Sequence, residues 1–245
     1  MAAKFYFLII MVLSLTGFYY PMEGAQSTKI KAIVFDFGGV IAKTDRQQVA
    51  AFIAQTFNIS QEDAMKSLEG LKENSLNDGI ENDFWQSYAK SKGKKLPDDW
   101  LKQLNEVRLN ALQEIPGMVE LVKCLKKQGY QTALLSNVRK SQAQIKRKLG
   151  FYDLFHPTIL SYEVGIRKPD PKSYHLILDK LNLPAEAVIF IDNKAPNVVA
   201  AKSIGMDGIL FENPDQLNKA LKERGIMCTL PNETQSVEKP ANEKP

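Results

Sequence analysis

Four groups of polar residues follow separate apolar runs of the chain, where their side chains could do chemistry together. They are Asp36, Ser136 with Asn137, Lys168, and Asp192 with Asn193. Taken singly, an Asp after an apolar run is usually a turn former, and Ser or Asn at a helix start is usually a cap. Together they supply two carboxylates, one ammonium group and one hydroxyl group. Four such groups in this order favour one shared site over four separate structural roles.

The elements that must position these residues are short apolar runs at 32–37, 131–136, 158–161, 187–192 and 207–211. The runs are nearly continuous in hydrophobicity, which is typical of strands buried on both faces. Between them lie helical stripes with apolar residues at i, i+3, i+4 and i+7. The stripes are Met118, Leu121, Val122 and Leu125, and then Tyr174, Ile177, Leu178 and Leu181.

Strands that alternate with helices predict an α/β fold with a Rossmann-like parallel sheet and helices on both faces. Gly129 stands where a glycine commonly ends a helix, after the first stripe. In such sheets ligands bind at the carboxyl ends of the strands. All four polar groups are expected at or just past such ends.

Residues 44–114 interrupt this alternation, because they show helical patterns and no convincing strand. We expect a helical cap domain here, inserted between the first and second strands and lying over the ligand crevice. Its aromatic residues at helical spacing are expected to form its own core rather than substrate contacts. They are Phe52, Trp85, Tyr88 and Trp100.

The N-terminal segment has the order of a secretory signal peptide. One lysine precedes the uncharged run 5–20, and a small-residue segment with Ala25-Gln26-Ser27 follows it. We expect residues 1–27 to be a signal peptide and the protein to be exported, periplasmic or secreted, with no stable membrane association after cleavage. An uncleaved N-terminal membrane anchor is the alternative, although the run is short for a span of about 20 residues.

The remaining boundaries follow from these assignments. Residues 28–43 and 115–228 are expected to form the α/β core domain, 44–114 the cap domain, and the polar segment 229–245 a flexible tail. The chain of 245 residues is 44% hydrophobic, with a formal net charge of +4. This mild charge, without an Arg/Lys-rich block, argues against nucleic-acid binding.

The two cysteines, Cys124 and Cys228, are far apart in the sequence. That separation argues against a metal knuckle. Cys124 lies on the apolar side of an expected helix and is interpreted as a plain core residue. We expect no disulfide framework.

The segments that carry the polar groups resemble the four motifs of the haloacid dehalogenase-like (HAD) hydrolase superfamily. These segments read VFDFGGV, LLSN, VGIRKPDPKSY and IFIDN. The resemblance covers residues 30–211 and includes a helical cap between the first two motifs. Within the superfamily, the residues of these motifs are most similar to those of sugar-phosphate phosphatases and of the phosphatase domain of some epoxide hydrolases.

The resemblance implies a magnesium-dependent phosphatase that forms an aspartyl-phosphate. Asp36 would be the nucleophile and Lys168 would balance its charge. Ser136, the backbone N–H of Asn137, and Gly39 would bind the phosphate. Mg²⁺ would be held by Asp36, the backbone carbonyl of Gly38, and Asp192, with Asn193 as a further candidate ligand.

Two residues depart from the pattern that this resemblance implies. Most phosphatases of the superfamily carry an acid-base Asp where this chain has Gly38, and two adjacent acids are common where it has Asn193. A general acid-base group contributes about 10² to 10⁴ in rate. Asp45 could stand in for it, but an exposed loop Asp is usually a turn former or helix cap.

Three functions remain open. The first is a phosphatase for a small phosphorylated metabolite, such as a sugar phosphate. The second is a non-catalytic or weakly active protein that binds a phosphorylated ligand or a partner. The third is a 2-haloacid dehalogenase, although such enzymes carry a tyrosine at the position of Gly38. The sequence does not specify the substrate or the oligomeric state.

Overall fold

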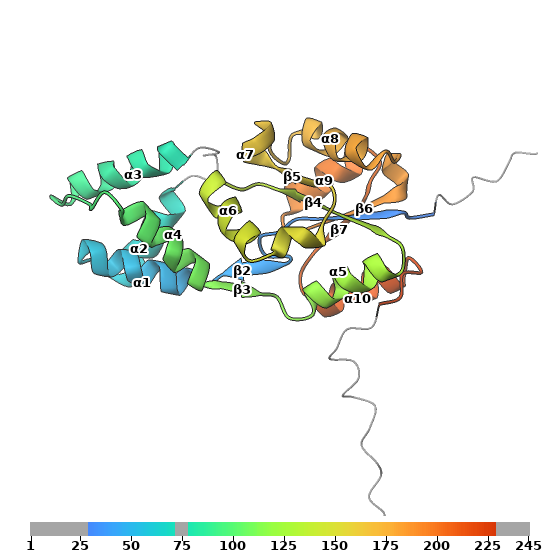
Figure 1. The fold of residues 1–245 in the computed structure, drawn as a ribbon, viewed down its shortest axis with the longest axis horizontal. Coiled ribbons are helices and arrows are strands. Elements are labelled where there is room, and N and C mark those ends of the chain that lie inside the picture. The colour runs from blue at the N-terminus through green and yellow to red at the C-terminus, as the bar shows by residue number, and fades with distance from the viewer. Residues whose placement is uncertain (1–28, 72–77, 229–245) are drawn as a thin grey trace, which may run out of the picture.

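A five-stranded parallel sheet forms the centre of the protein (Figure 1). The structure is a computed structural model, and it describes residues 29–71 and 78–228. The strands lie in the order β5-β4-β1-β6-β7. Their bounds are β1 Ala32–Phe35, β4 Gln131–Ser136, β5 Thr158–Leu160, β6 Val188–Asp192 and β7 Asp207–Leu210. The five strands predicted from the sequence are all present, and the predicted α/β class is confirmed.

β1 is the central strand of the sheet. After β1 the chain adds β4 and then β5 on one side, and it later returns to add β6 and β7 on the other side. A crevice for ligands opens where the strand order reverses in this way, at the carboxyl ends of the strands. In this sheet the reversal lies between β1 and β6, and the last residues that pair between them are Phe35 and Ile191.

Helices cover both faces of the sheet because successive strand residues point to opposite faces. α5 and α10 lie on one face of the sheet, and α8 and α9 lie on the other (Figure 1). Ile33 and Phe35 of β1 pack with α5 and α10, whereas Ala32 and Val34 pack with α8 and α9. Both predicted apolar stripes are buried. These helices and their neighbours are α5 Met118–Lys127, α6 Lys140–Lys148, α7 Ser161–Val164, α8 Pro171–Leu181, α9 Ala195–Ser203 and α10 Pro214–Lys222, with the short 3₁₀ helices η1 Phe151–Leu154 and η2 Ala185–Ala187.

Four further helices form a separate cluster beside the sheet (Figure 1). They are α1 Arg46–Phe57, α2 Gln61–Gly70, α3 Asp78–Ser91 and α4 Trp100–Asn110, and we call them the four-helix region. Trp85 and Trp100 are buried in the middle of this cluster, with Phe52 and Tyr88 packed against it. The expectation that these aromatic side chains form a core is confirmed.

The prediction that residues 44–114 contain no strand is wrong at both ends. β2 (Ala42–Thr44) pairs antiparallel with β3 (Leu112–Glu114), which gives a two-stranded ribbon where the chain enters and leaves the four-helix region. The strands have three residues each, and most of their side chains are exposed. The sequence could not show this pairing, because such short strands carry no alternation of apolar and polar residues.

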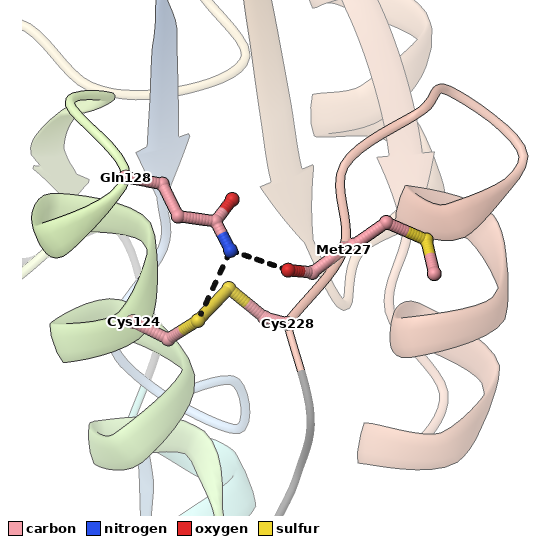
Figure 2. The surroundings of a disulfide bond; sticks show 4 residues. All are labelled: Cys124, Gln128, Met227 and Cys228. Atoms are coloured by element: carbon pink, nitrogen blue, oxygen red, sulfur yellow. Dashed lines mark hydrogen bonds between the residues drawn. A yellow bond between two sulfur atoms is a disulfide. The ribbon is translucent and has the colours of Figure 1, made fainter.

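The predictions that Cys124 is a plain core residue and that the protein has no disulfide framework are also wrong. Cys124 of α5 and Cys228 form a disulfide, with their Cα atoms 6.0 Å apart (Figure 2). The segment after α10 turns back over α5, and Gln128 donates a hydrogen bond to the carbonyl oxygen of Met227 beside the bridge. Cys124 is half-buried at the edge of the core rather than inside it. Only this return of the chain brings together two cysteines that are 104 residues apart.

Removal of this disulfide is expected to lower the free energy of unfolding by about 2–5 kcal/mol, because the cross-link restricts a long loop in the unfolded chain. Urea unfolding of the oxidised protein, the reduced protein and a Cys124→Ser/Cys228→Ser variant measures the change. The variant should match the reduced protein and should not respond to reductant. Two free thiols in the oxidised protein under denaturing conditions would contradict the assignment.

The expected signal peptide and tail lie outside the described residues. Within residues 29–71 and 78–228, no helix combines the length and the hydrophobicity that crossing a membrane requires.

Candidate active site

Two carboxylates and one lysine meet at the reversal point of the sheet. Lys168 Nζ lies 2.7 Å from Asp36 Oδ1 and 2.6 Å from Asp192 Oδ2. All three side chains are buried. Residues 132 positions apart are therefore joined in one hydrogen-bonded cluster, and its net charge is negative when both carboxylates are ionised.

The strands set the positions of both carboxylates. The backbone N–H of Asp36 donates to the carbonyl oxygen of Ile191 at 2.8 Å, which continues the pairing of β1 with β6 by one residue. Asp192 is the last residue of β6, and its Oδ1 accepts from the backbone N–H of Lys194 at 2.8 Å. Its Oδ2 also accepts from Asn197 Nδ2 at 2.9 Å. Both Asp192 oxygens are thus fixed, whereas Lys168 Nζ is bonded to only one oxygen of Asp36.

Asn137 positions the lysine. Its amide nitrogen donates to the carbonyl oxygen of Lys168 at 2.8 Å, and its amide oxygen accepts from the Lys168 N–H at 3.0 Å. This two-point contact holds the backbone of the loop that carries the ammonium group. Ser136, directly before it, is buried and lines the same cavity as Asp36. Ser136 and Asn137, two of the three residues predicted to bind phosphate, therefore line the same cavity as Asp36.

The two glycines after Asp36 differ in the space around them. Gly39 has a φ of +82°, and a Cβ there would come within 2.3 Å of Asn193 Nδ2. That position requires glycine. A Cβ on Gly38 would meet only Asp36 Oδ2, at 3.9 Å, which is ordinary contact. Position 38 thus has room for a Cβ atom, yet the chain has glycine there.

An open cavity of about 450 Å³ with a basic wall lies at this site. Its lining includes Asp36, Gly38, Gly39, Ser136, Asn137 and Lys168. Asp36 is the one carboxylate among its lining residues, and its basic residues are Lys43, Arg46, Lys146, Lys168 and Lys194. Such a wall attracts anions and strengthens their binding where water is excluded. The cavity therefore suits an anionic ligand whose reacting atom lies near Asp36.

Burial raises the pKa of Asp36 above its ordinary value. Lys168 acts against this shift, and the nearby Asp192 carboxylate adds to it. A single ammonium group, that of Lys168, faces two carboxylates. Additional positive charge beside Asp36 would therefore favour its ionised form.

The donor atoms fit a hard divalent cation. Two carboxylates and a loop carbonyl at Gly38 are oxygen donors of the kind that Mg²⁺ prefers, and Mg²⁺ is usually held by one or two carboxylates with waters and phosphate oxygens. No group of three or more His, Cys, Asp or Glu side chains that could hold a metal occurs among the residues described. Asn193 is exposed with its amide against Gly39, so its role as a ligand stays a prediction.

Asp45, the other candidate acid, has a structural role. Its carboxylate accepts from the backbone N–H of Gln47 at 2.9 Å and caps the N-terminus of α1. The expectation that it is a helix cap is confirmed.

A second buried charge cluster links the four-helix region to the sheet. Glu81 of α3 is fully buried and bonds Arg108 of α4 at 2.6 Å and Arg139 at 3.0 Å. Burial raises the pKa of Glu81, but the two arginines more than offset this and hold it below its ordinary value. Arg139 is the residue before α6 and follows the Ser136-Asn137 segment. The four-helix region is therefore tied by charge to the segment beside the cavity.

Three features of the site are not predicted by the sequence, namely Asn197, Lys146 and the Glu81 cluster. Asn197 follows Asp192 by five residues and reaches it from the first turn of α9, which a helix start after a strand end could have suggested. Lys146 and Glu81 gave no such signal, because their neighbours at the site come from distant segments.

The sheet with inserted helices, and the Asp36–Lys168–Asp192 cluster at its carboxyl edge, define an α/β protein whose site joins two carboxylates and a lysine. The family model of the haloacid dehalogenase-like hydrolases matches residues 30–205, and the chain belongs to this family.

Curated relatives confirm the branch that the motifs indicated. Flavin mononucleotide hydrolase 1 of Arabidopsis thaliana is 33% identical over 131 residues, 54% of each chain. Bifunctional epoxide hydrolase 2 of Sus scrofa is 29% identical over 143 residues, 55% of this chain and 25% of its own. The phosphorylated carbohydrates phosphatase of Thermotoga maritima is 26% identical over 211 residues, 81% of this chain and 93% of its own. The chain thus spans only about half or less of the first two relatives.

Solved structures show the same fold. A HAD family enzyme of Bacteroides thetaiotaomicron, determined as a magnesium complex, superposes with a TM-score of 0.63 at 22% identity. The match covers 79% of this chain and 98% of that one.

Proposed function

We propose that the protein is a magnesium-dependent phosphatase that hydrolyses a small phosphorylated metabolite through an aspartyl-phosphate on Asp36. The observation that carries this proposal is the contact of Lys168 with both Asp36 and Asp192 in a cavity with a basic wall. The relatives include enzymes named for flavin mononucleotide and for phosphorylated carbohydrates, which supports a small phosphate ester as the substrate.

In this proposal Asp36 attacks phosphorus with Oδ2, since Lys168 holds Oδ1. The bond between phosphorus and the ester oxygen breaks as the aspartyl-phosphate forms, and water then attacks phosphorus to release phosphate and the free carboxylate. Lys168 keeps Asp36 ionised and shares the charge of the transferring group. The Ser136 hydroxyl, the Asn137 N–H and the Gly39 backbone hold the phosphate oxygens.

Asp36, Asp192 and the Gly38 carbonyl are the residues that would hold Mg²⁺. When bound, the cation offsets the repulsion between the anionic nucleophile and the anionic substrate. Asn193 contributes no charge, so we propose a weaker magnesium affinity than a site with two adjacent acids has.

We also propose that residues 44–114 act as a cap that selects the substrate, on a core formed by residues 28–43 and 115–228. The ribbon of β2 and β3, the separate core of the four-helix region and the contact of Glu81 with Arg139 support this division. The cap would close over the cavity and exclude water from the reacting phosphate.

Phosphate release from a panel of phosphate esters tests the function. The purified full-length protein is assayed with Mg²⁺ and with EDTA, beside the variant Asp36→Asn. We expect magnesium-dependent release from at least one ester by the wild type. Release that nowhere exceeds that of Asp36→Asn would contradict the proposal.

A non-catalytic or weakly active phosphate-binding protein is the second candidate, because position 38 has no acid although a Cβ atom there meets no close contact. Phosphate that protects both the wild type and Asp36→Asn against thermal unfolding, without any ester being hydrolysed, would favour it.

We further propose that the protein works outside the cytosol, as an exported protein or one held by an N-terminal anchor. The uncharged run 5–20 and the disulfide support this, since disulfides persist in oxidising compartments. Fractionation of cells that express a tagged full-length chain is expected to find it in the exported or membrane fraction. Recovery only from the soluble cytosol, with reduced cysteines, would contradict this location.

A further inference from the structure

Lys146 stands out because its ammonium group lies beside the candidate site, with no ion-pair partner among residues 29–71 and 78–228. It is a half-buried residue of α6, and its Nζ lies over the ring of Phe37, 4.5 Å from the centroid. Phe37 follows Asp36 directly and is itself fully buried. The described residues give Lys146 no carboxylate within ion-pair distance, whereas the adjacent Arg147 bonds Glu163 at 2.6 Å.

This arrangement is costly for a residue that serves only structure. A lysine removed from water without a carboxylate partner favours its neutral form. Burial accordingly lowers the pKa of Lys146 to about 8, with the charge of Asp36 acting in the opposite direction. Another lysine of this helix, Lys148, is exposed to water.

Lys146 also lies where two cavities join. The cavity at Asp36 shares part of its lining with a second cavity of about 160 Å³ against the four-helix region. The shared residues are Thr44, Arg46, Leu112, Gln142 and Lys146. The second cavity continues with apolar side chains, among them Val49, Leu68 and Ile145. A phosphate at Asp36 with its organic group in the second cavity places the ester oxygen at the junction.

We propose that Lys146 contacts this ester oxygen and donates the proton that the leaving alcohol needs, in place of a carboxylic acid at position 38. The inference rests on the phosphatase function proposed above. Lys146 is the one junction residue suited to the role. Arg46 is exposed and turned toward Glu69 at 3.8 Å, and a guanidinium group does not release its proton.

The proton balance closes over the two steps. In the first, Asp36 forms a bond to phosphorus, the ester bond breaks with its electron pair on the leaving oxygen, and the Lys146 ammonium donates a proton to give a neutral alcohol and a neutral amine. In the second, water attacks phosphorus, the bond to Asp36 breaks, and the amine accepts a proton from that water. Ester and water thus become alcohol and phosphate, with Asp36 and Lys146 restored.

The dependence of rate on the leaving group tests the proposal. The full-length protein hydrolyses a series of para-substituted phenyl phosphates that differ in the acidity of the released phenol. A proton donor matters most for the least acidic phenol, so Lys146→Met should lose about 10²-fold there and less than about threefold on p-nitrophenyl phosphate. Loss of structure alone would lower all rates by one factor.

Two variants sharpen this result. Lys146→Arg keeps the charge and the ring contact but does not donate its proton, so it should show the same steep dependence as Lys146→Met. Lys148→Met, on the exposed part of the same helix, should match the wild type.

Equal losses on every ester, no loss, or full activity of Lys146→Arg on the least acidic phenol would each overturn the role of Lys146. Absence of release by the wild type, relative to Asp36→Asn, would instead overturn the phosphatase function itself, so the two failures are distinct.

Discussion

Asp36→Asn is expected to reduce phosphate release at least about 10³-fold while leaving the protein folded, because it removes the nucleophile on which both chemical steps depend. The amide has nearly the shape of the carboxylate. Lys168 keeps its second partner, since its Nζ also lies 2.6 Å from Asp192. Burial and Asp192 both disfavour the charge of Asp36, so its loss should not lower the thermal stability.

Steady-state release of phosphate and thermal unfolding, measured on the same preparations, check both parts of this prediction. Asp179→Asn is the matched control, because Asp179 is an exposed carboxylate of α8. It should keep full activity. An Asp36→Asn protein with more than a tenth of the wild-type rate would exclude Asp36 as the nucleophile.

Adding Gly38→Asp to Lys146→Met is expected to raise the rate of that variant about 10²-fold on esters with poor leaving groups, because it places an acid beside the reacting phosphate. A Cβ atom fits there, no closer than 3.9 Å to Asp36 Oδ2. The nearby carboxylates of Asp36 and Asp192 would raise the pKa of the new carboxyl group and help it to keep a proton. In the wild type, where Lys146 already donates, the gain should be small.

A double-mutant cycle with Gly38→Asp and Lys146→Met measures this coupling, with the leaving-group series as the readout. Gly39→Asp is the control one residue further on, where a Cβ would clash with Asn193 and the φ of +82° disfavours a side chain. That variant should be inactive or less stable. A gain from Gly38→Asp that is equal with and without Lys146 would mean that the two residues act independently.

The sheet and the candidate site follow largely from local patterns. Continuous apolar runs marked all five parallel strands, and polar residues at their ends marked Asp36, Ser136 and Asp192. This succeeds because the carboxyl ends of parallel strands meet at one edge, so that residues far apart in sequence must converge.

What the sequence did not show depends on contacts between distant segments. The disulfide of Cys124 requires the chain after α10 to return over α5. The position of Lys146 over Phe37 requires α6 to lie beside the loop after β1. Neither contact leaves a periodic pattern, because each depends on a single residue whose partner is set by the tertiary structure. The same holds for Glu81 and Arg139.

The ribbon of β2 and β3 has a mechanical consequence for the protein. The Gly39 N–H donates to the carbonyl oxygen of Ala42 at 2.8 Å, and Ala42 is also the first residue of β2. The turn beside Asp36 and the strand that carries the four-helix region are therefore one hydrogen-bonded unit. A rotation of these helices about the ribbon would also displace the turn beside Asp36.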